Sequence, residues 1–285
     1  MQPVFSRIAV ALSVPLLSAL VLLTVNAWAQ EGAQPGSLCE MADSDDVQML
    51  ELEPSLFHAE YADMTAGFVP RRLVYIMQDT EGVVRGRLKL SMSVAAAEGE
   101  LHRELVKEYE YPFVGSSRVV VESLSLSPVE CSLTLYDLQS GPIPDGTQPA
   151  ETWSANYYYD LVAVNVESKD VGTFYSFRHP MKAYDLEELY LLFSQLAVER
   201  FPRLSVLFVT APFRYRNYAV LIRRLGRESI YAADAEKHIC ERLRLEFSDS
   251  TQEFYVETLP PHRVVKFTAG QITYTLIEDN TAYEE

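Results

Sequence analysis

The sequence predicts a mainly β protein, an antiparallel meander or open half-barrel of about twelve strands with a single amphipathic helix. Three observations carry this prediction. Apolar and polar residues alternate along many short segments, as in strands with one buried face. Most turns between these segments are so short that they can join only antiparallel neighbours. Only one segment, 185–200, carries apolar residues at helical spacing.

The clearest strand lies at residues 88–94, where Leu88, Leu90, Met92 and Val94 alternate with polar side chains. Other segments of this kind precede the helix at 73–76, 119–126, 131–135, 157–166 and 173–177. More follow it at 205–209, 215–223, 228–233, 238–247, 252–257, 263–268 and 271–277. A Gly- and Pro-rich loop at 139–152 is interpreted as a long connection within one sheet, and the alternative is a domain linker.

The expected helix spans Asp185 to Arg200. Asp185 can cap its start, and Glu188 completes a capping-box pair. One face would be apolar and pack on the sheet: Leu186, Leu189, Tyr190, Phe193, Leu196 and Ala197. The opposite face would be wet, with Leu191 as its exception: Glu187, Glu188, Gln195 and Glu199. Pro202 ends the segment.

Residues 1–29 have the pattern of a cleaved signal peptide. Arg7 precedes an apolar run from Ile8 to Val25, and Ala27-Trp28-Ala29 offers small residues at the cleavage site. The alternative is an uncleaved membrane anchor. Leu38 is too large to precede a lipidated cysteine, which argues against acylation of Cys39. The sequence therefore predicts an exported protein, periplasmic or extracellular, and not an integral membrane protein after cleavage.

The mature chain is divided by composition into a flexible acidic leader at 30–55, a single β-rich domain at 56–279 and a tail at 280–285. The formal net charge of −16 argues against a nucleic-acid partner, which requires clustered positive charge. It also argues against docking on anionic lipid headgroups.

The sequence lacks the common catalytic motifs. It contains no Gly-x-Ser-x-Gly elbow, no phosphate-binding glycine loop and no His-Glu-x-x-His pair. Its five histidines are scattered along the chain. We therefore expect no enzyme activity, no metal site and no cofactor, although two of the many carboxylates could still converge and act as acid and base.

The chain has three cysteines, Cys39, Cys131 and Cys240, which allow one disulfide and leave one thiol over. An exported protein can form disulfides, and Cys131 and Cys240 both lie in strand-like segments that a cross-strand bridge could join. The alternative, which we favour, is that all three thiols remain reduced and that the two strand cysteines are buried as small apolar residues.

The order of elements in the second half resembles a known exported bacterial family. After the helix come Gly226-Arg227-Glu228-Ser229-Ile230-Tyr231, a turn at Asp234, and the late strand Pro261-His262-Arg263-Val264-Val265-Lys266-Phe267. In the first half, Val121 to Val129 is similar to a further strand of that family. These segments resemble "domain of unknown function 3108", although Ala235 stands where a turn glycine is usual.

The resemblance implies a curved antiparallel sheet or half-barrel, similar to lipocalin-like and periplasmic lipoprotein-carrier folds. We expect the amphipathic helix to pack on the concave side, because a half-barrel needs an element over that face. It implies no established activity and no catalytic residue. A lipid or other apolar ligand could then lie in a groove lined by Leu189, Phe193, Leu196, Tyr157 and Tyr159. The alternative is that these residues only complete the core and the strands.

Three functions therefore remain open, in this order. The first is an exported, non-enzymatic protein that binds an apolar or amphipathic ligand. The second is a structural or partner-binding envelope protein with a filled interior. The third is a glycan-acting enzyme. The first two differ in whether the interior is open or packed.

Overall fold

The structure, a computed structural model, describes residues 49–52, 70–97, 100–123, 125–169, 171–180, 183–194, 198–201, 203–232 and 236–281. Contacts divide the chain into Met1–Asp45 and Asp46–Glu285, and all the described residues belong to the second unit. The expected signal peptide, the leader apart from residues 49–52, Cys39 and Leu196 lie outside the described residues.

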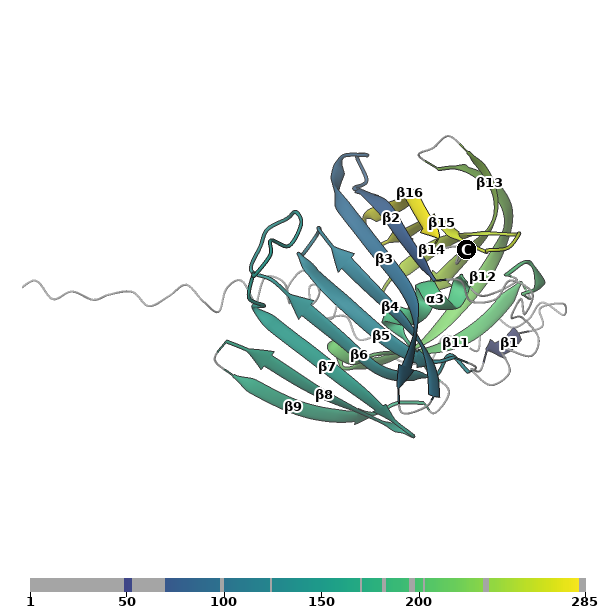
Figure 1. Ribbon diagram of the computed structural model, residues 1–285. Coiled ribbons are helices and arrows are strands. Elements are labelled where there is room, and N and C mark those ends of the chain that lie inside the picture. Colours follow the sequence, from purple (N-terminus) through teal and green to yellow (C-terminus); the bar gives the residue numbers. More distant parts are fainter. Residues whose placement is uncertain are drawn as a thin grey trace, which may run out of the picture. The chain divides into compact units, whose positions relative to one another are not determined.

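One sheet organises the described residues (Figure 1). Its strands before the helix are β1 Met49–Leu52, β2 Arg71–Gln78, β3 Val84–Ala97, β4 Glu100–Tyr109, β5 Gly115–Glu122, β6 Pro128–Leu135, β7 Glu151–Tyr158, β8 Leu161–Ser168, β9 Gly172–Arg178 and β10 Tyr184–Asp185. Those after it are β11 Leu204–Ala211, β12 Arg216–Tyr231, β13 Lys237–Glu246, β14 Thr251–Glu257, β15 Val264–Ala269 and β16 Ile272–Thr281.

The strand order is β1-β11-β12-β13-β14-β15-β16-β2-β3-β4-β5-β6-β7-β8-β9, and β10 pairs with β11 off this path. All pairs are antiparallel except those that β1 and β10 make with β11. The chain thus runs through two meanders, β2 to β9 and β11 to β16, which β16 and β2 join side by side. The predicted loop at 139–152 lies in the connection between the paired neighbours β6 and β7, except for its last two residues, which begin β7.

The expected mainly β fold is confirmed, whereas the strand count of about twelve is wrong, because the described residues already place fifteen strands on the main path and β10 adds another. The segment 157–166 covers parts of two strands separated by a turn at Tyr159 and Asp160, while the predicted strands at 215–223 and 228–233 both overlap the single strand β12, Arg216–Tyr231. The strands β1, β4 and β10 were not predicted.

The sheet is open, but β9, at one end of the strand order, contacts the segment that follows β11 near the other end. There β9 meets the segment between β11 and β12, which contains the short 3-10 helix η3, Pro212–Arg214. The Asn217 side-chain amide donates to the Arg178 carbonyl at 2.9 Å, and the Tyr175 hydroxyl donates to the Pro212 carbonyl at 3.0 Å. Side chains make this contact, and no β ladder joins β9 to β12.

The expected helix is much shorter than its pattern suggested. A 3-10 turn η1, Leu186–Glu188, leads into α3, Leu189–Phe193, and another 3-10 turn, η2, spans Val198–Arg200. The capping box is confirmed: Asp185 Oδ1 accepts the Glu187 backbone N–H at 2.6 Å, and Glu188 Oε1 accepts the Asp185 N–H at 3.0 Å.

The prediction that one face of the helix is exposed to solvent is wrong. All five residues of α3 are buried, including Leu191, and Glu188 in η1 is buried as well. A helix that is apolar all round belongs in a core. Here the sheet curves around α3, so each side of the helix faces a strand (Figure 1).

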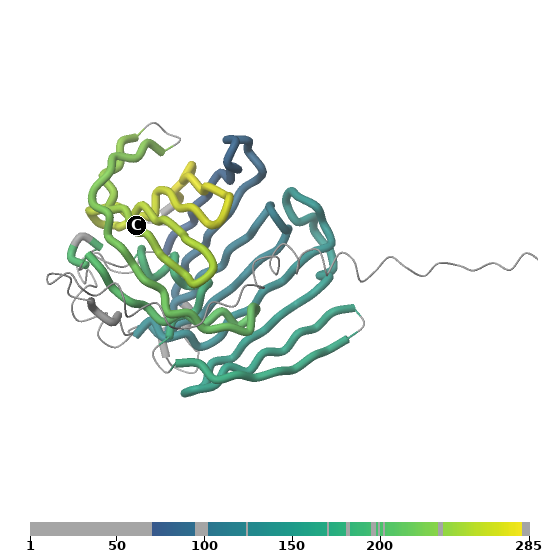
Figure 2. Tube along the Cα trace, turned by 180° about the vertical axis from the view of Figure 1, so that it is seen from behind, coloured from purple at the N-terminus to yellow at the C-terminus, as the bar shows by residue number. Residues whose placement is uncertain are grey.

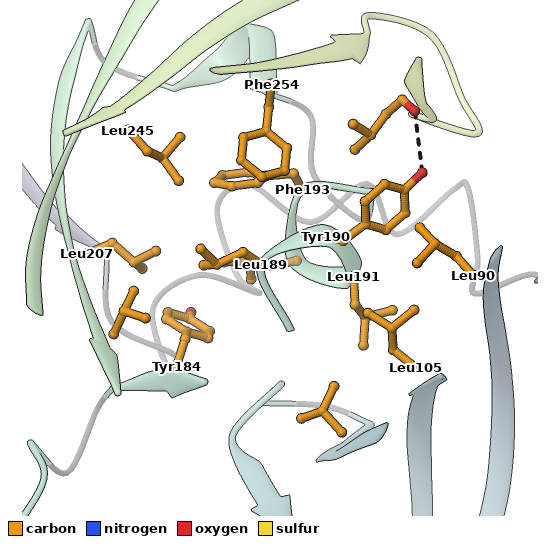
Figure 3. Packing of buried hydrophobic residues seen from close by; sticks show 14 of the residues in the cluster. Leu90, Leu105, Tyr184, Leu189, Tyr190, Leu191, Phe193, Leu207, Leu245 and Phe254 are labelled. Atoms are coloured by element: carbon orange, nitrogen blue, oxygen red, sulfur yellow. Dashed lines mark hydrogen bonds between the residues drawn. The ribbon is translucent and has the colours of Figure 1, made fainter. Parts of the chain in front are cut away.

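The core forms between α3 and the inner face of the sheet. Figure 3 shows Leu90 and Leu105 approaching α3 on one side, and Leu207, Leu245 and Phe254 on another. The rings of Phe193 and Phe254 lie 5.0 Å apart. The Tyr75 hydroxyl donates to the Val264 carbonyl at 2.7 Å and is also hydrogen-bonded to the Tyr190 hydroxyl. Apolar packing and these polar contacts together fix α3 to both meanders.

The strands β12 and β13 extend beyond the rest of the sheet. β11 pairs with β12 only as far as Arg223, while β12 and β13 remain paired up to Tyr231 and Lys237. Figure 2 shows this hairpin rising past its neighbours. We call residues 229–231 and 237–239, which pair only with each other, the hairpin arm.

Candidate functional site

A polar cluster lies under η1, inside the curve of the sheet. The carboxylate of Glu187 accepts hydrogen bonds from Lys107 Nζ at 3.0 Å, Ser117 Oγ at 3.0 Å and the Tyr109 hydroxyl at 3.2 Å. Burial alone would raise the pKa of Glu187, but the charge of Lys107 and these donors hold the pKa below its usual value. Glu187 is therefore a structural anion at neutral pH.

Two further carboxyl groups, by contrast, have raised pKa values. Burial raises the pKa of Asp185 to about 7, although the Tyr157 hydroxyl and the Glu187 N–H both donate to it. Burial and the neighbouring Asp185 raise the pKa of Glu188 well above its usual value. The Oε2 atom of Glu188 meets no hydrogen-bond partner among the described residues, which suits a neutral carboxyl group.

Converging carboxyl groups with shifted pKa values are a feature of acid–base active sites. Here, however, Asp185 is 0% exposed and Glu188 is 1% exposed, so no substrate can reach them in this conformation. Their oxygens close the capping box at the start of η1. The cluster therefore anchors the helical segment to β4, β5 and β7.

The residues expected to line a ligand groove do not form one together. Leu189 and Phe193 are buried in α3, and the Tyr157 hydroxyl points inward to Asp185. Tyr159 lies in the turn between β7 and β8 and is 80% exposed. Leu196 is outside the described residues. The interior near Leu189 and Phe193 is occupied by side chains (Figure 3).

The bridge considered between Cys131 and Cys240 is not formed. Both thiols are free and buried. Cys131 belongs to the core around α3, whereas Cys240 belongs to a separate cluster with Ile230, Tyr255 and Val265. Burial raises the pKa of both thiols, that of Cys240 to about 12, so neither is an activated nucleophile.

One edge of the sheet is β9, at the opposite end of the strand order from β1. Ser168 N–H donates to the Val171 carbonyl at 3.1 Å, and His179 N–H donates to the Asp160 carbonyl at 3.0 Å. In an antiparallel pair every second residue bonds to its neighbour, so Gly172, Phe174, Ser176 and Arg178 direct their backbone groups away from β8.

Two outward backbone carbonyl groups of this edge already accept hydrogen bonds from side chains. Tyr215 and Asn217 donate to the carbonyls of Ser176 and Arg178. At Gly172 and Phe174 the described residues provide no neighbouring strand. This end of β9 is a template for another strand.

Exposed apolar side chains accompany this edge on the outer face of the sheet. Phe174 is 69% exposed, and Tyr158 and Leu161 lie on the same face of β7 and β8. Natural sheets usually protect an edge strand with charged residues or proline, and β9 has only Arg178. Sequence reasoning did not find this site, since the pairing order decides which strand is an edge.

Comparisons with known proteins add little. No family model matches the chain, so no such match supports the resemblance to domain of unknown function 3108. No curated protein matches it either. Among solved structures, the chain is similar to a protein of Parabacteroides distasonis described as "a putative lipoprotein", at 13% identity over 75% of this chain and 96% of that one, with a TM-score of 0.31. A likeness of this size indicates neither fold nor function.

The described residues contain no helix long and apolar enough to cross a membrane. Nor do three or more His, Cys, Asp or Glu side chains gather among them as metal ligands.

Proposed function

We propose that this chain is an exported, non-enzymatic envelope protein that binds a protein partner by strand addition at β9. The observation that carries the proposal is the edge at Gly172 and Phe174, where backbone groups point outward beside exposed apolar side chains. In strand addition, backbone hydrogen bonds provide affinity and side-chain contacts provide selectivity. The partner would supply an extended segment with an apolar residue opposite Phe174.

The packed interior favours this function over an apolar-ligand carrier. A carrier needs an internal cavity, and ligand pockets usually measure about 300–1,000 Å³. The aromatic and aliphatic side chains of α3 instead belong to one buried cluster with side chains from strands of both meanders. With the inside of the curve filled by Phe193 and its neighbours, the outer face and the edges are left for binding.

Export is the second component of the proposal, and it rests on the signal-peptide pattern of residues 1–29. Amino-terminal sequencing of the protein from an envelope fraction tests it. We expect a chain that begins at Gln30. A chain that retains Met1 would support the membrane-anchor alternative.

The binding component is tested with two substitutions at one residue. Phe174→Pro removes an outward N–H, while the ladder to β8 through Thr173 and Tyr175 remains. Phe174→Thr keeps the N–H and removes only the aromatic side chain. Whole cells that express the full-length tagged chain would be cross-linked, and the adducts resolved by mass.

We expect one discrete adduct with the native chain, a weaker one with Phe174→Thr, and none with Phe174→Pro. Circular dichroism should show that both variants are folded. Equal adducts in all three chains would contradict binding at β9. Native mass spectrometry of the purified protein gives an independent result, because a bound lipid-sized mass would favour the carrier function.

A further inference from the structure

Two side chains near the start of β12 occupy backbone acceptors that a partner strand at β9 would use. The Tyr215 hydroxyl donates to the carbonyl of Ser176 at 3.3 Å, and the Asn217 amide donates to the carbonyl of Arg178 at 2.9 Å. Both carbonyls belong to positions of β9 whose backbone groups point away from β8. We call this pair of hydrogen bonds the clasp.

The clasp leaves only a short open edge. β9 is seven residues long, and its first two outward positions, Gly172 and Phe174, are clear of the clasp. Strands of globular proteins are usually about five to six residues long. A partner strand of that length that begins opposite Gly172 extends to Ser176, where its backbone meets the side chain of Tyr215. Such a strand therefore cannot pair fully with β9 while the clasp is closed.

The clasp is held by side chains and has no support from a β ladder, because β9 pairs only with β8 in the strand order of the described residues. Its two hydrogen bonds lie at exposed positions and join neutral groups, and such bonds contribute little individually. The ring of Tyr215 packs on Tyr175 and Phe177 but remains 57% exposed. Tyr215 also has a φ of +53°, which is uncommon for a residue with a side chain.

Other contacts hold β9 to η3 without blocking the edge. Tyr175 on β9 pairs with the buried Val164 and points inward, where its hydroxyl donates to the Pro212 carbonyl at 3.0 Å. The ring of Trp153 lies 6.0 Å from that of Phe213 in η3. These groups do not lie at the outward positions of β9, so a partner strand need not displace them. The clasp can open while η3 keeps its place.

We propose that the partner strand pairs with the whole of β9 and displaces the clasp, which opposes binding until the partner is present. This inference rests on strand addition as the proposed function. Backbone N–H groups of the partner take the places of the Tyr215 hydroxyl and the Asn217 amide at the two carbonyls. The partner therefore has no proline at these two positions. Because the closed clasp favours the unbound state, its loss should strengthen binding.

Tyr215→Phe combined with Asn217→Asp tests the competition. Phenylalanine keeps the ring without the hydroxyl donor, and aspartate keeps the oxygen that accepts from Thr210 Oγ1 without the N–H donors. Tyr231→Phe combined with Asn280→Asp is the matched control, because it makes the same changes at exposed residues of the hairpin arm and of β16. Whole cells that express each full-length tagged chain would be cross-linked with a limiting amount of reagent.

We expect about fivefold more adduct from the clasp variant than from the native chain, since a neutral hydrogen bond contributes about this factor, and no change from the control. Circular dichroism should show that both variants are folded. Equal or less adduct from the clasp variant would overturn the competition, although strand addition would stand if Phe174→Pro still abolished the adduct. An adduct that Phe174→Pro leaves unchanged would instead contradict the proposed function itself.

The reach of the partner strand is tested with photoreactive benzoylphenylalanine in place of Arg178. This side chain is exposed on the same face as Phe174, and its replacement leaves the backbone carbonyl and the clasp intact. We expect light-dependent capture of a partner of the same mass as in the chemical adduct. Capture by the probe in place of Phe174 but not in place of Arg178 would confine the partner to the open end of β9 and overturn the inference. Absence of capture at both positions would contradict strand addition.

Discussion

Tyr157 on β7 donates its hydroxyl hydrogen to Asp185, the residue that caps η1. The same carboxyl group accepts the Glu187 N–H through its other oxygen. One buried side chain therefore connects the first meander to the start of the helical segment. Because the pKa of Asp185 is raised to about 7, this connecting carboxyl group changes its charge near neutral pH.

Asp185→Asn should remove a pH dependence of stability. In the folded chain the carboxyl stays protonated up to about pH 7, whereas in the unfolded chain it ionises near its ordinary value of 3.8. Between these pH values the folded state binds more protons, so the free energy of unfolding decreases as pH rises, by about 1.4 kcal/mol per pH unit. Asparagine keeps the cap and does not ionise.

Urea unfolding of both chains at several pH values from 4.5 to 7.5 measures this effect. We expect the stability of Asp185→Asn relative to the native chain to increase with pH. Loss of the Asp185 charge also lowers the pKa of Glu188, which adds to the difference with the same sign, whereas titrating groups that do not interact with Asp185 cancel. Parallel curves would show that Asp185 does not have a raised pKa in the folded protein.

Lys107→Met should destabilise the fold by about 2 kcal/mol, between the values for surface and buried ion pairs, because it leaves the partly buried carboxylate of Glu187 without its counter-charge. Ser117 and Tyr109 still donate to that carboxylate. The double variant Lys107→Met with Glu187→Gln should recover most of the loss, since the remaining amide is neutral. A loss under about 0.5 kcal/mol in urea unfolding would place this pair among ordinary surface ion pairs.

Sequence patterns predicted much of the sheet. The alternation at 88–94 is correct for Leu88, Leu90 and Met92, which are buried. Val94 is 47% exposed, although its parity is the same. The alternation determines which face of the sheet a side chain occupies. Whether that side chain is buried also depends on how far the core extends along the strand.

The helical segment shows which features sequence patterns could predict and which they could not. The capping box at Asp185 and Glu188 is local, and the sequence predicted it. The burial of Glu187 depends on Lys107 and Ser117, which lie 80 and 70 positions away in the chain. An acidic residue looks solvated until its distant partners are known, so an enclosed helix was predicted as amphipathic.

The buried thiols should be unreactive until the protein unfolds. Cys131 and Cys240 are free and shielded by different clusters. In a Cys39→Ser chain, we expect no maleimide labelling of the native protein and two labelled thiols in concentrated guanidinium chloride without reductant. An unfolded chain with no reactive thiol would indicate a disulfide.

Phe193→Ala and Tyr159→Ala should differ sharply in their effect on stability. Phe193 is 0% exposed and its ring contacts Phe254, so its truncation should destabilise the fold by about 3–5 kcal/mol through lost burial and a new cavity. Tyr159 is exposed, and its truncation should change the free energy of unfolding by no more than about 0.5 kcal/mol.

The comparison discriminates between a filled interior and a ligand groove. If Phe193 lined an open groove, water or ligand would already contact its ring, and alanine there would cost little more than at Tyr159. Phe193→Leu keeps much of the volume and should cost less than about 1.5 kcal/mol. Urea unfolding of these three variants therefore measures how tightly α3 is enclosed, which is the basis for assigning binding to the edge and outer face of the sheet.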